Sequence, residues 1–285
     1  IRQFRTGFHR SEINPSVLEE QLFSMRFACL LTVLVFLSKI GFGQDFSLYS
    51  KEQFVVGADT LQYRLLMPDN YKPYKKYPLV VFLHGSGERG SDNEAQLKHG
   101  GSLFVQDSVR KRYPAIVIFP QCPAEQQWTD IRGRWDEATK RQVIYGLTGK
   151  NNTPARLVAQ LVQRMVREQE VDEQRIYLGG LSLGGFGTFA LAAEYPGLFA
   201  AAFPICGGGE ASLVERYNPK TAWWLFHGAK DNVVNPEFSR YFYKTLKQKE
   251  FAVQYTEYPE AQHDSWTQAF KEWRLLPWLF AQRLK

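Results

Sequence analysis

The sequence predicts an α/β fold with a doubly wound, mostly parallel sheet and helices on both faces. Two observations favour this class. Short apolar runs recur along the chain, and their hydrophobicity is continuous rather than alternating, which is typical of strands buried on both faces. Segments with helical periodicity lie between these runs from residue 79 to residue 285. We find no internal repeat, low-complexity tract or linker, and therefore expect a single domain over residues 44–285.

The elements are expected in the following order. Residues 46–66 should form short antiparallel strands, because a turn at "GADT" joins "QFVV" to "LQYRLL". Buried strands are expected at 79–85, 115–120, 175–180, 201–206, 222–228 and 251–258. Helices are expected at 155–169, 185–195, 236–249 and 265–283. Residues 121–150 form the longest irregular piece, and a connection of that length often lies over an active site.

The N-terminus is predicted to be a processing segment. Residues 25–43 combine a charged start, a short apolar stretch and a small-x-small site formed by Gly41 and Gly43, the pattern of a secretory signal peptide. The apolar stretch is shorter than the roughly 20 residues that span a bilayer, although a short membrane anchor is the alternative. Residues 1–24 fit no element of the fold, and we expect them to be a mis-called upstream extension. The mature protein should be secreted or periplasmic, with no stable membrane insertion.

Charge and motif content argue against two classes of function, nucleic-acid binding and metal-dependent chemistry. The net charge is +6, and no block of Lys and Arg occurs beyond residue 43, so we expect a solvated basic surface and no nucleic-acid binding. No H-E-x-x-H motif occurs, and the histidines lack the spacing of metal ligands. We therefore expect no metal and no cofactor.

Ser182 is the candidate nucleophile. It stands at the centre of G-x-S-x-G, from Gly180 to Gly184, between a predicted strand and a predicted helix. The glycines allow a sharp turn that would expose the serine hydroxyl, and the helix dipole favours negative charge there. A Gly-rich turn needed only for packing is the alternative, and the strand-turn-helix context favours the catalytic interpretation.

A serine nucleophile needs a base, and His263 is the best placed of five histidines. It lies after the last strand and before the last helix, where it can reach over the carboxyl ends of the strands. His9 lies in the N-terminal extension, and His99 has no evident partner. His84 and His227 each end a strand before a glycine, where we expect turn histidines that bond to nearby backbone.

Asp231 is the candidate acid, because it follows the strand at 222–228. It gives the chain order Ser-Asp-His, which is that of α/β-hydrolases. The weaker candidates are Asp264, which is adjacent to the histidine and cannot easily reach its ring, and Glu257 and Glu260, which lie within or just after the last strand. Backbone amides of Leu183, directly after the nucleophile, and of Ser86, in the glycine-containing loop at 84–90, are the candidate oxyanion donors.

The motifs "VVFLHGSGERGSDNEAQLKHG", "FPQCP…W", "GGLSLGGFGTFALAAEYP", "FPICGGG", "FHGAKDNVV" and "HDSWTQAF" resemble a group of small α/β-hydrolases. This group comprises the so-called predicted peptidases and phospholipase/carboxylesterase-like proteins, which are related to dienelactone hydrolases and to the catalytic domain of prolyl oligopeptidases. The resemblance spans about residues 50–283. It implies a triad of Ser182, Asp231 and His263, oxyanion donors at Ser86 and Leu183, and a pocket wall at Trp128.

The resemblance leaves the substrate open. Relatives of similar size cleave esters, including acyl groups on carbohydrates, and the chain has no room for the propeller of prolyl oligopeptidases. We therefore expect a secreted carboxylic ester hydrolase that acts on a small-molecule or carbohydrate-linked ester. The alternatives are a small serine peptidase of prolyl-oligopeptidase type and a non-catalytic binding protein on a hydrolase scaffold.

Two cysteines remain after Cys29 leaves with the signal peptide. In the usual hydrolase sheet, two strands separate the strand that ends near Cys122 from the one that ends near Cys206. Three strand spacings amount to about 14 Å, whereas a disulfide needs Cα atoms within about 7 Å. We expect both thiols to stay unpaired.

Overall fold

The computed structural model describes residues 46–136, 141–168 and 171–284. The predicted signal peptide and upstream extension lie outside these residues. Within them, no helix combines the length and the apolar character that crossing a membrane requires.

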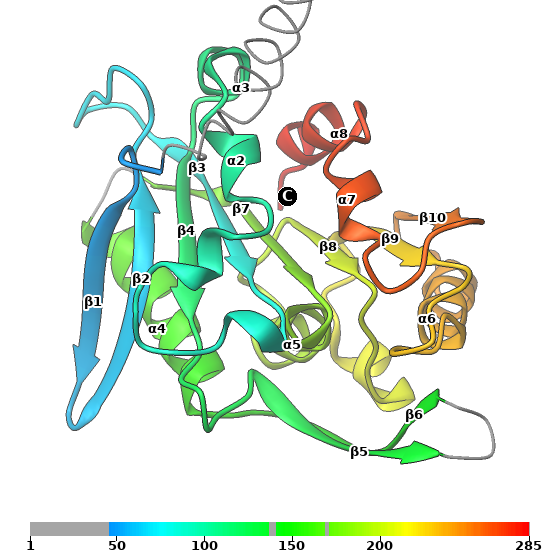
Figure 1. Ribbon diagram of the computed structural model, residues 1–285. Helices are drawn as coiled ribbons and strands as arrows, with labels where there is room; N and C mark the ends of the chain where they lie inside the picture. The colour runs from blue at the N-terminus through cyan, green and yellow to red at the C-terminus, as the bar shows by residue number, and fades with distance from the viewer. Residues whose placement is uncertain (1–45, 137–140, 169–170, 285) are drawn as a thin grey trace, which may run out of the picture. The chain divides into compact units, whose positions relative to one another are not determined.

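Eight strands form the main sheet (Figure 1). In spatial order they are β1 (Ser50–Val56), β2 (Asp59–Leu66), β4 (Ile116–Gln121), β3 (Tyr77–Leu83), β7 (Val171–Leu181), β8 (Ala201–Ile205), β9 (Ala222–Gly228) and β10 (Val253–Tyr258). The β1–β2 and β2–β4 pairs are antiparallel, and every later pair is parallel. The predicted fold class is confirmed, including the antiparallel N-terminal strands.

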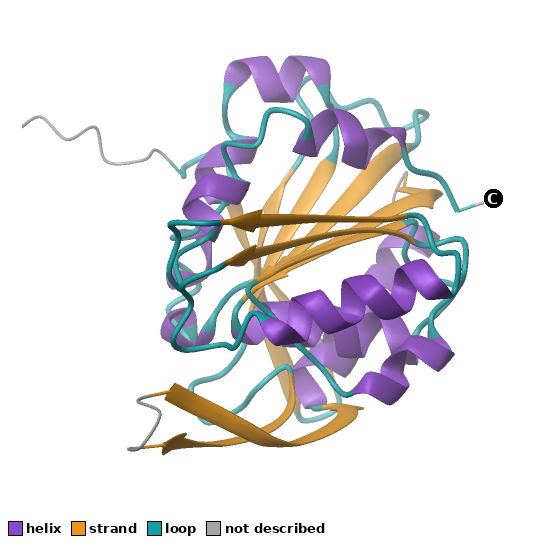
Figure 2. Ribbon diagram, turned by 90° about the vertical axis from the view of Figure 1, so that its right-hand side faces the viewer, coloured by secondary structure: helices purple, strands orange, loops and turns teal. Residues whose placement is uncertain are grey.

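Helices cover both faces of this sheet (Figure 2). One apolar cluster contains buried residues of α4 (Thr153–Glu168), α5 (Leu183–Glu194) and α6 (Glu237–Gln248). The other contains buried residues of α2 (Gly101–Phe104), α3 (Asp107–Arg112), α7 (Trp266–Ala269) and α8 (Leu275–Ala281). Strand β3 is apolar throughout because both of its faces are buried. Val81 packs in the first cluster, and the next residue, Phe82, packs in the second.

Two expectations about single segments are wrong. Residues 265–283 do not form one helix, because α7 ends at Ala269 and α8 begins at Leu275. A continuous helix would place Pro277 in its interior, where it removes a hydrogen bond and clashes with the preceding turn. In the structure Pro277 lies in the first turn of α8, where its missing N–H costs nothing.

Residues 121–150 are not irregular throughout either. They contain β5 (Thr129–Asp136) and most of β6 (Arg141–Asn151), which pair antiparallel as a separate two-stranded sheet. The signal was present in "TDIRGRWD", where charged residues alternate with uncharged ones at the period of a strand.

The sheet brings the carboxyl ends of its parallel strands to one edge. The segments that follow β3, β7, β9 and β10 carry His84, Ser182, Asp231 and His263 respectively. In open α/β sheets, ligands bind outside these carboxyl ends. The strand order β4-β3-β7-β8 that separates the two cysteines is also confirmed, and both Cys122 and Cys206 are free and buried.

Candidate active site

Ser182 occupies a strained turn between β7 and α5. Its φ of 52° and ψ of −116° are unusual for a residue with a side chain. The turn needs glycine on both sides. A Cβ on Gly184 would lie 2.0 Å from the carbonyl oxygen of Leu83, and a Cβ on Gly180 would lie 2.3 Å from the carbonyl oxygen of Gly184. The G-x-S-x-G sequence therefore permits a backbone path that other residues would block.

The structure brings Ser182, His263 and Asp231 together in one hydrogen-bonded chain. His263 Nε2 lies 2.9 Å from Ser182 Oγ, and His263 Nδ1 lies 2.8 Å from Asp231 Oδ2. Because a carboxylate only accepts, Nδ1–H donates to it, which leaves Nε2 to accept the serine proton. The His263 side chain is 20% exposed and the Asp231 side chain is fully buried. The imidazole is therefore partly open to solvent, while the carboxylate stays away from water.

Asp231 is held as a carboxylate by several donors. The backbone N–H groups of Val233 and Val234 donate to Oδ1 at 2.8 and 2.9 Å. Burial disfavours the charge, but hydrogen bonds from His227 and His263 outweigh it, so the pKa of Asp231 lies well below its usual range. The carboxylate is thus ionised at neutral pH and can stabilise an imidazolium at His263.

His227 is a residue whose role the sequence analysis missed. It does bond to nearby backbone, as expected, because Nε2 lies 3.0 Å from the Val234 carbonyl oxygen. The same Nε2 also lies 3.3 Å from Asp231 Oδ2, and Nδ1 lies 2.7 Å from Ser239 Oγ. A carbonyl only accepts, so Nε2 carries the proton and Nδ1 accepts from the serine hydroxyl. The "HGAKD" spacing was the available signal, since it places the histidine four residues before the acid.

The predicted oxyanion donors lie on two segments that meet at the serine. Leu183 begins α5, where the first N–H groups of a helix have no intrahelical partner. Ser86 begins the short 3-10 helix η1 (Ser86–Glu88), directly after Gly85. A Cβ on Gly85 would lie 3.6 Å from the Ser182 Cβ, so this loop approaches the serine closely.

His84 fixes the loop that carries Ser86. Its Nδ1 lies 2.6 Å from the Gly85 carbonyl oxygen, and its Nε2 accepts a hydrogen bond from the Cys122 backbone N–H at 2.9 Å. In a planar trans peptide the N–H points opposite to the C=O, so the Ser86 N–H points away from the His84 ring. Burial lowers the pKa of His84 to about 4, and this ring is neutral at neutral pH.

Trp128 lies behind this loop. Its indole N–H donates to the His84 carbonyl oxygen at 3.0 Å, and its ring packs edge-on against the His84 ring. The side chain has no exposed surface. The structure thus shows Trp128 supporting the loop, and its role as a pocket wall stays a prediction.

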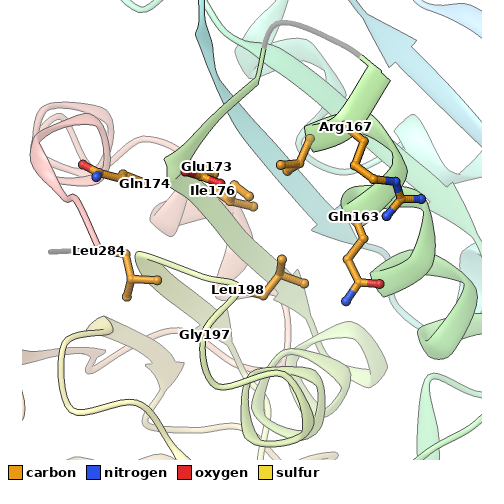
Figure 3. Close-up of a pocket in the computed structure, with 9 residues that line it drawn as sticks. Gln163, Arg167, Glu173, Gln174, Ile176, Gly197, Leu198 and Leu284 are labelled. Atoms are coloured by element: carbon orange, nitrogen blue, oxygen red, sulfur yellow. The ribbon is translucent and has the colours of Figure 1, made fainter.

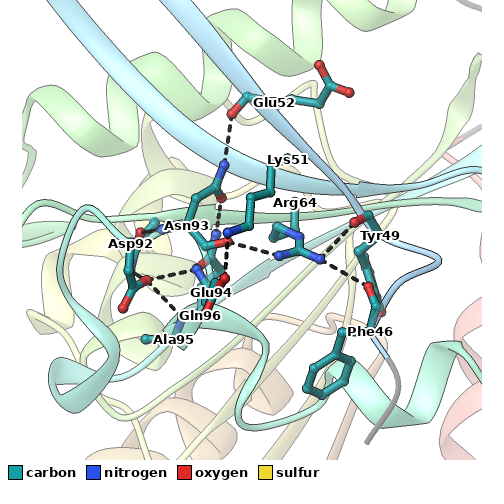
Figure 4. A network of polar contacts seen from close by, with 11 residues as sticks. Phe46, Tyr49, Lys51, Glu52, Arg64, Asp92, Asn93, Glu94, Ala95 and Gln96 are labelled. Atoms are coloured by element: carbon teal, nitrogen blue, oxygen red, sulfur yellow. Dashed lines mark hydrogen bonds and ion pairs between the residues drawn. The ribbon is translucent and has the colours of Figure 1, made fainter.

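A polar network ties the same loop to the first two strands (Figure 4). The buried Arg64 guanidinium of β2 donates to the carbonyl oxygens of Phe46, Tyr49 and Asn93. Gln121, at the end of β4, donates to the Glu88 carbonyl oxygen and accepts from the Asn93 N–H. The segment from η1 to residue 97 is therefore anchored to both β2 and β4.

One group of side chains at this site has the composition of a metal site. Cys206, Asp231 and His263 present atoms within 4.8 Å of one another. The nearest oxygen and nitrogen atoms already bond to each other, and burial holds the pKa of the Cys206 thiol well above its usual range. A metal ion there would have to break the hydrogen bond between Asp231 and His263.

A pocket of about 450 Å³ lies at the other end of β7 (Figure 3). Its lining includes Glu173, Gln174 and Ile176 of that strand, whereas Ser182 follows the carboxyl end of the same strand. The pocket is therefore separate from the serine.

Comparison with known proteins gives one family and several relatives. The sequence model of the family described as Phospholipase/Carboxylesterase matches residues 71–274. Poly(3-hydroxyalkanoate) depolymerase C of Paucimonas lemoignei is 33% identical over 131 residues, which are 46% of this chain and 28% of that protein. Acetylxylan esterase A of Emericella nidulans is 25% identical over 143 residues, 50% of this chain and 43% of the relative. The matched segments thus span less than half the length of these two relatives.

Solved structures show the same fold. A thermostable esterase superposes with a TM-score of 0.74 at 35% identity, over 83% of this chain and 64% of the esterase. A ferulic acid esterase from Anaeromyces mucronatus superposes with a TM-score of 0.59 at 17% identity, over 82% of this chain and 90% of that chain. The second likeness is one of fold alone.

Proposed function

Because the chain belongs to the phospholipase/carboxylesterase family of α/β-hydrolases, we propose that it is a serine hydrolase that cleaves carboxylic esters. The observation that carries the proposal is the chain of hydrogen bonds through His263, at 2.9 Å to Ser182 Oγ and 2.8 Å to Asp231 Oδ2. This arrangement supplies a nucleophile, a base and a group that orients the base.

The first half of the reaction forms an acyl-enzyme. Ser182 Oγ attacks the ester carbonyl carbon while His263 Nε2 takes the serine proton. The oxyanion accepts hydrogen bonds from the amides of Ser86 and Leu183. The tetrahedral intermediate then collapses: the bond to the alcohol oxygen breaks, and His263 gives its proton to that oxygen. Asp231 stabilises the imidazolium that exists between these two transfers.

The second half regenerates the serine. Water replaces the alcohol, gives a proton to His263 and attacks the acyl carbon. Collapse of this second intermediate breaks the bond to Ser182 Oγ, which recovers the proton, and a carboxylic acid leaves. No electron transfer occurs in either half, so these steps require no redox cofactor.

Esters are the favoured substrates over amides. An alcohol leaves more easily than an amine, and two of the similar proteins, acetylxylan esterase A and the thermostable esterase, are esterases by name. The test compares a short-chain p-nitrophenyl ester with a proline-containing aminoacyl amide. We expect rapid turnover of the ester and slow or no turnover of the amide. Preferential cleavage of the amide would indicate a peptidase, and cleavage of neither would favour a binding protein.

Export is part of the proposal. It is supported by the charged start, the apolar stretch and the small-x-small site within residues 25–43. N-terminal sequencing of the exported protein should find Gln44 at or near the first position, and export with residues 25–43 retained would contradict it.

A further inference from the structure

The alcohol part of an ester must leave past His263, because that imidazole gives its proton to the departing oxygen. This inference rests on the proposed function. The residue whose ring borders His263 is Trp266, at the start of α7: the two ring centroids lie 5.4 Å apart and the ring planes meet at 87°. Trp266 is half-buried. The side chains around Trp266 are therefore the candidates for contact with the alcohol.

Two polar side chains continue from Trp266 to the loop that carries Ser86. The His99 ring packs beside the Trp266 ring with centroids 5.1 Å apart. His99 Nε2 lies 3.5 Å from Glu88 Oε1, and Glu88 ends the short helix that Ser86 begins. A continuous row of three side chains, which we term the arc, thus runs from the loop that carries Ser86 to His263. Its members are Glu88, His99 and Trp266.

The arc lies close to the nucleophile and is held in place. A Cβ on Gly85 would lie 3.2 Å from Glu88 Oε2 and 3.6 Å from the Ser182 Cβ, so the carboxylate is on the serine side of the loop. Next to His99, Gly100 has a φ of +92°, and a Cβ there would lie 2.8 Å from the Phe270 ring. The His99 turn therefore packs directly on the segment that follows Trp266.

Burial makes the arc selective. The Glu88 side chain is only 7% exposed, and the polar side-chain contact that the described part of the chain gives it is with His99, whose Nε2 lies 3.5 Å from Oε1. Burial lowers the pKa of His99 despite the nearby carboxylate, which favours a neutral imidazole with one donor and one acceptor. An almost buried carboxylate beside a neutral imidazole requires hydrogen-bond donors from whatever covers it, or it loses hydration without compensation.

We propose that the arc of Glu88, His99 and Trp266 is the subsite for the alcohol part of the substrate, and that it selects a polyhydroxylated alcohol such as a sugar ring. The apolar face of such a ring covers the indole, and its neighbouring hydroxyls donate to the carboxylate and exchange hydrogen bonds with the imidazole. An apolar alcohol would leave the carboxylate without a partner, which disfavours it.

A cationic alcohol is the rival occupant, because the Glu88 carboxylate also attracts a positive charge. A quaternary ammonium group has no N–H to donate, so it cannot hydrogen-bond to the carboxylate oxygens, whereas the hydroxyls of a sugar can.

Hydrolysis of three acetates tests the subsite: a mono-acetylated methyl xyloside, cyclohexyl acetate and acetylcholine. They share the acyl group and differ in the alcohol. We expect the sugar ester to have the highest kcat/KM. Glu88→Gln and His99→Phe should each lower the ratio of kcat/KM for the sugar ester to that for cyclohexyl acetate by about 10-fold or more. Glu168→Gln, an equal loss of charge at a side chain 62% exposed on α4, should leave the ratio unchanged.

Binding separates failure of the subsite from failure of the proposed function. In the Ser182→Ala background, titration calorimetry with the acetylated xyloside should show binding that Glu88→Gln weakens at least about 10-fold. If the wild-type protein hydrolyses no ester but this binding pattern holds, the proposed function is wrong and the arc stands as a binding site for hydroxylated rings. Binding that neither arc variant changes, an unchanged ratio, or a preference for acetylcholine that Glu88→Gln removes would overturn the subsite assignment.

Discussion

His227 contacts the same oxygen of Asp231 that His263 contacts. Its Nε2 lies 3.3 Å from Asp231 Oδ2, whereas His263 Nδ1 lies 2.8 Å from that atom. His227 has no exposed surface and bonds to Ser239, so it cannot meet a substrate. We infer that it is a positioning residue, which fixes the carboxylate that orients the proposed base.

This relationship gives the first prediction. His227→Leu removes the donor from Asp231 and should lower kcat for a p-nitrophenyl ester by about 10-fold or more, the effect of one hydrogen bond to a charged group, with little change in KM. His227→Gln can still donate and should recover part of the loss. Equal kcat values for the two variants, at matched thermal stability, would show that the residue acts only through packing.

Replacement of Ser182 by Ala should abolish labelling by a fluorophosphonate and lower turnover by about 10⁴-fold or more. The reason is that the proposed acyl-enzyme cannot form without the hydroxyl. Mass spectrometry of the labelled protein identifies the site. Labelling of Ser86 in the variant would point to a different nucleophile.

Asp231 and Asp264 form a matched pair for testing the acid. Asp231→Asn should lower kcat by about 10³- to 10⁴-fold, because an amide cannot stabilise the imidazolium and favours the wrong tautomer of His263. Asp264 is exposed, and Asp264→Asn should change kcat by less than about threefold. The assignment would be reversed if Asp264→Asn proved the more damaging.

The depressed pKa of His84 predicts a pH dependence of stability. The unfolded chain takes up a proton near pH 6.5 and the folded protein only near pH 4, so this histidine contributes full stability above about pH 6.5 and loses it as the pH falls toward 4. The loss amounts to about 3 kcal/mol. Urea unfolding at pH 7.5 and pH 4.5 should therefore show a smaller pH effect for His84→Gln than for the wild type, and equal pH effects would contradict the neutral assignment.

Both cysteines of the folded domain should be unreactive in the native protein and reactive after unfolding. They are fully buried, and burial raises the pKa of the Cys122 thiol to about 12. A chromogenic disulfide reagent added to protein that begins at Gln44 should release no colour before denaturant and two equivalents after it. A chain that gives none after denaturant would contain a disulfide, against the observed strand order.

The sequence by itself determined the features that depend on residues adjacent to one another in the chain. Continuous apolar runs predicted the parallel strands, because a strand buried on both faces has no polar position. The glycines around Ser182 predicted the sharp turn, because the backbone there passes too close to Leu83 for any side chain at Gly184. These signals are local, so they can be recognised in the printed chain.

The tertiary structure decided the pairings between residues distant in sequence. His99 had no partner in the sequence, yet the fold places it between Glu88 and Trp266. His227 was expected to bond to nearby backbone, and the segment after β9 also folds back to bring Asp231 and Ser239 to its two nitrogens. Such contacts arise because the sheet gathers separate loops at one edge. Residue type and local spacing do not encode which of the gathered side chains will meet.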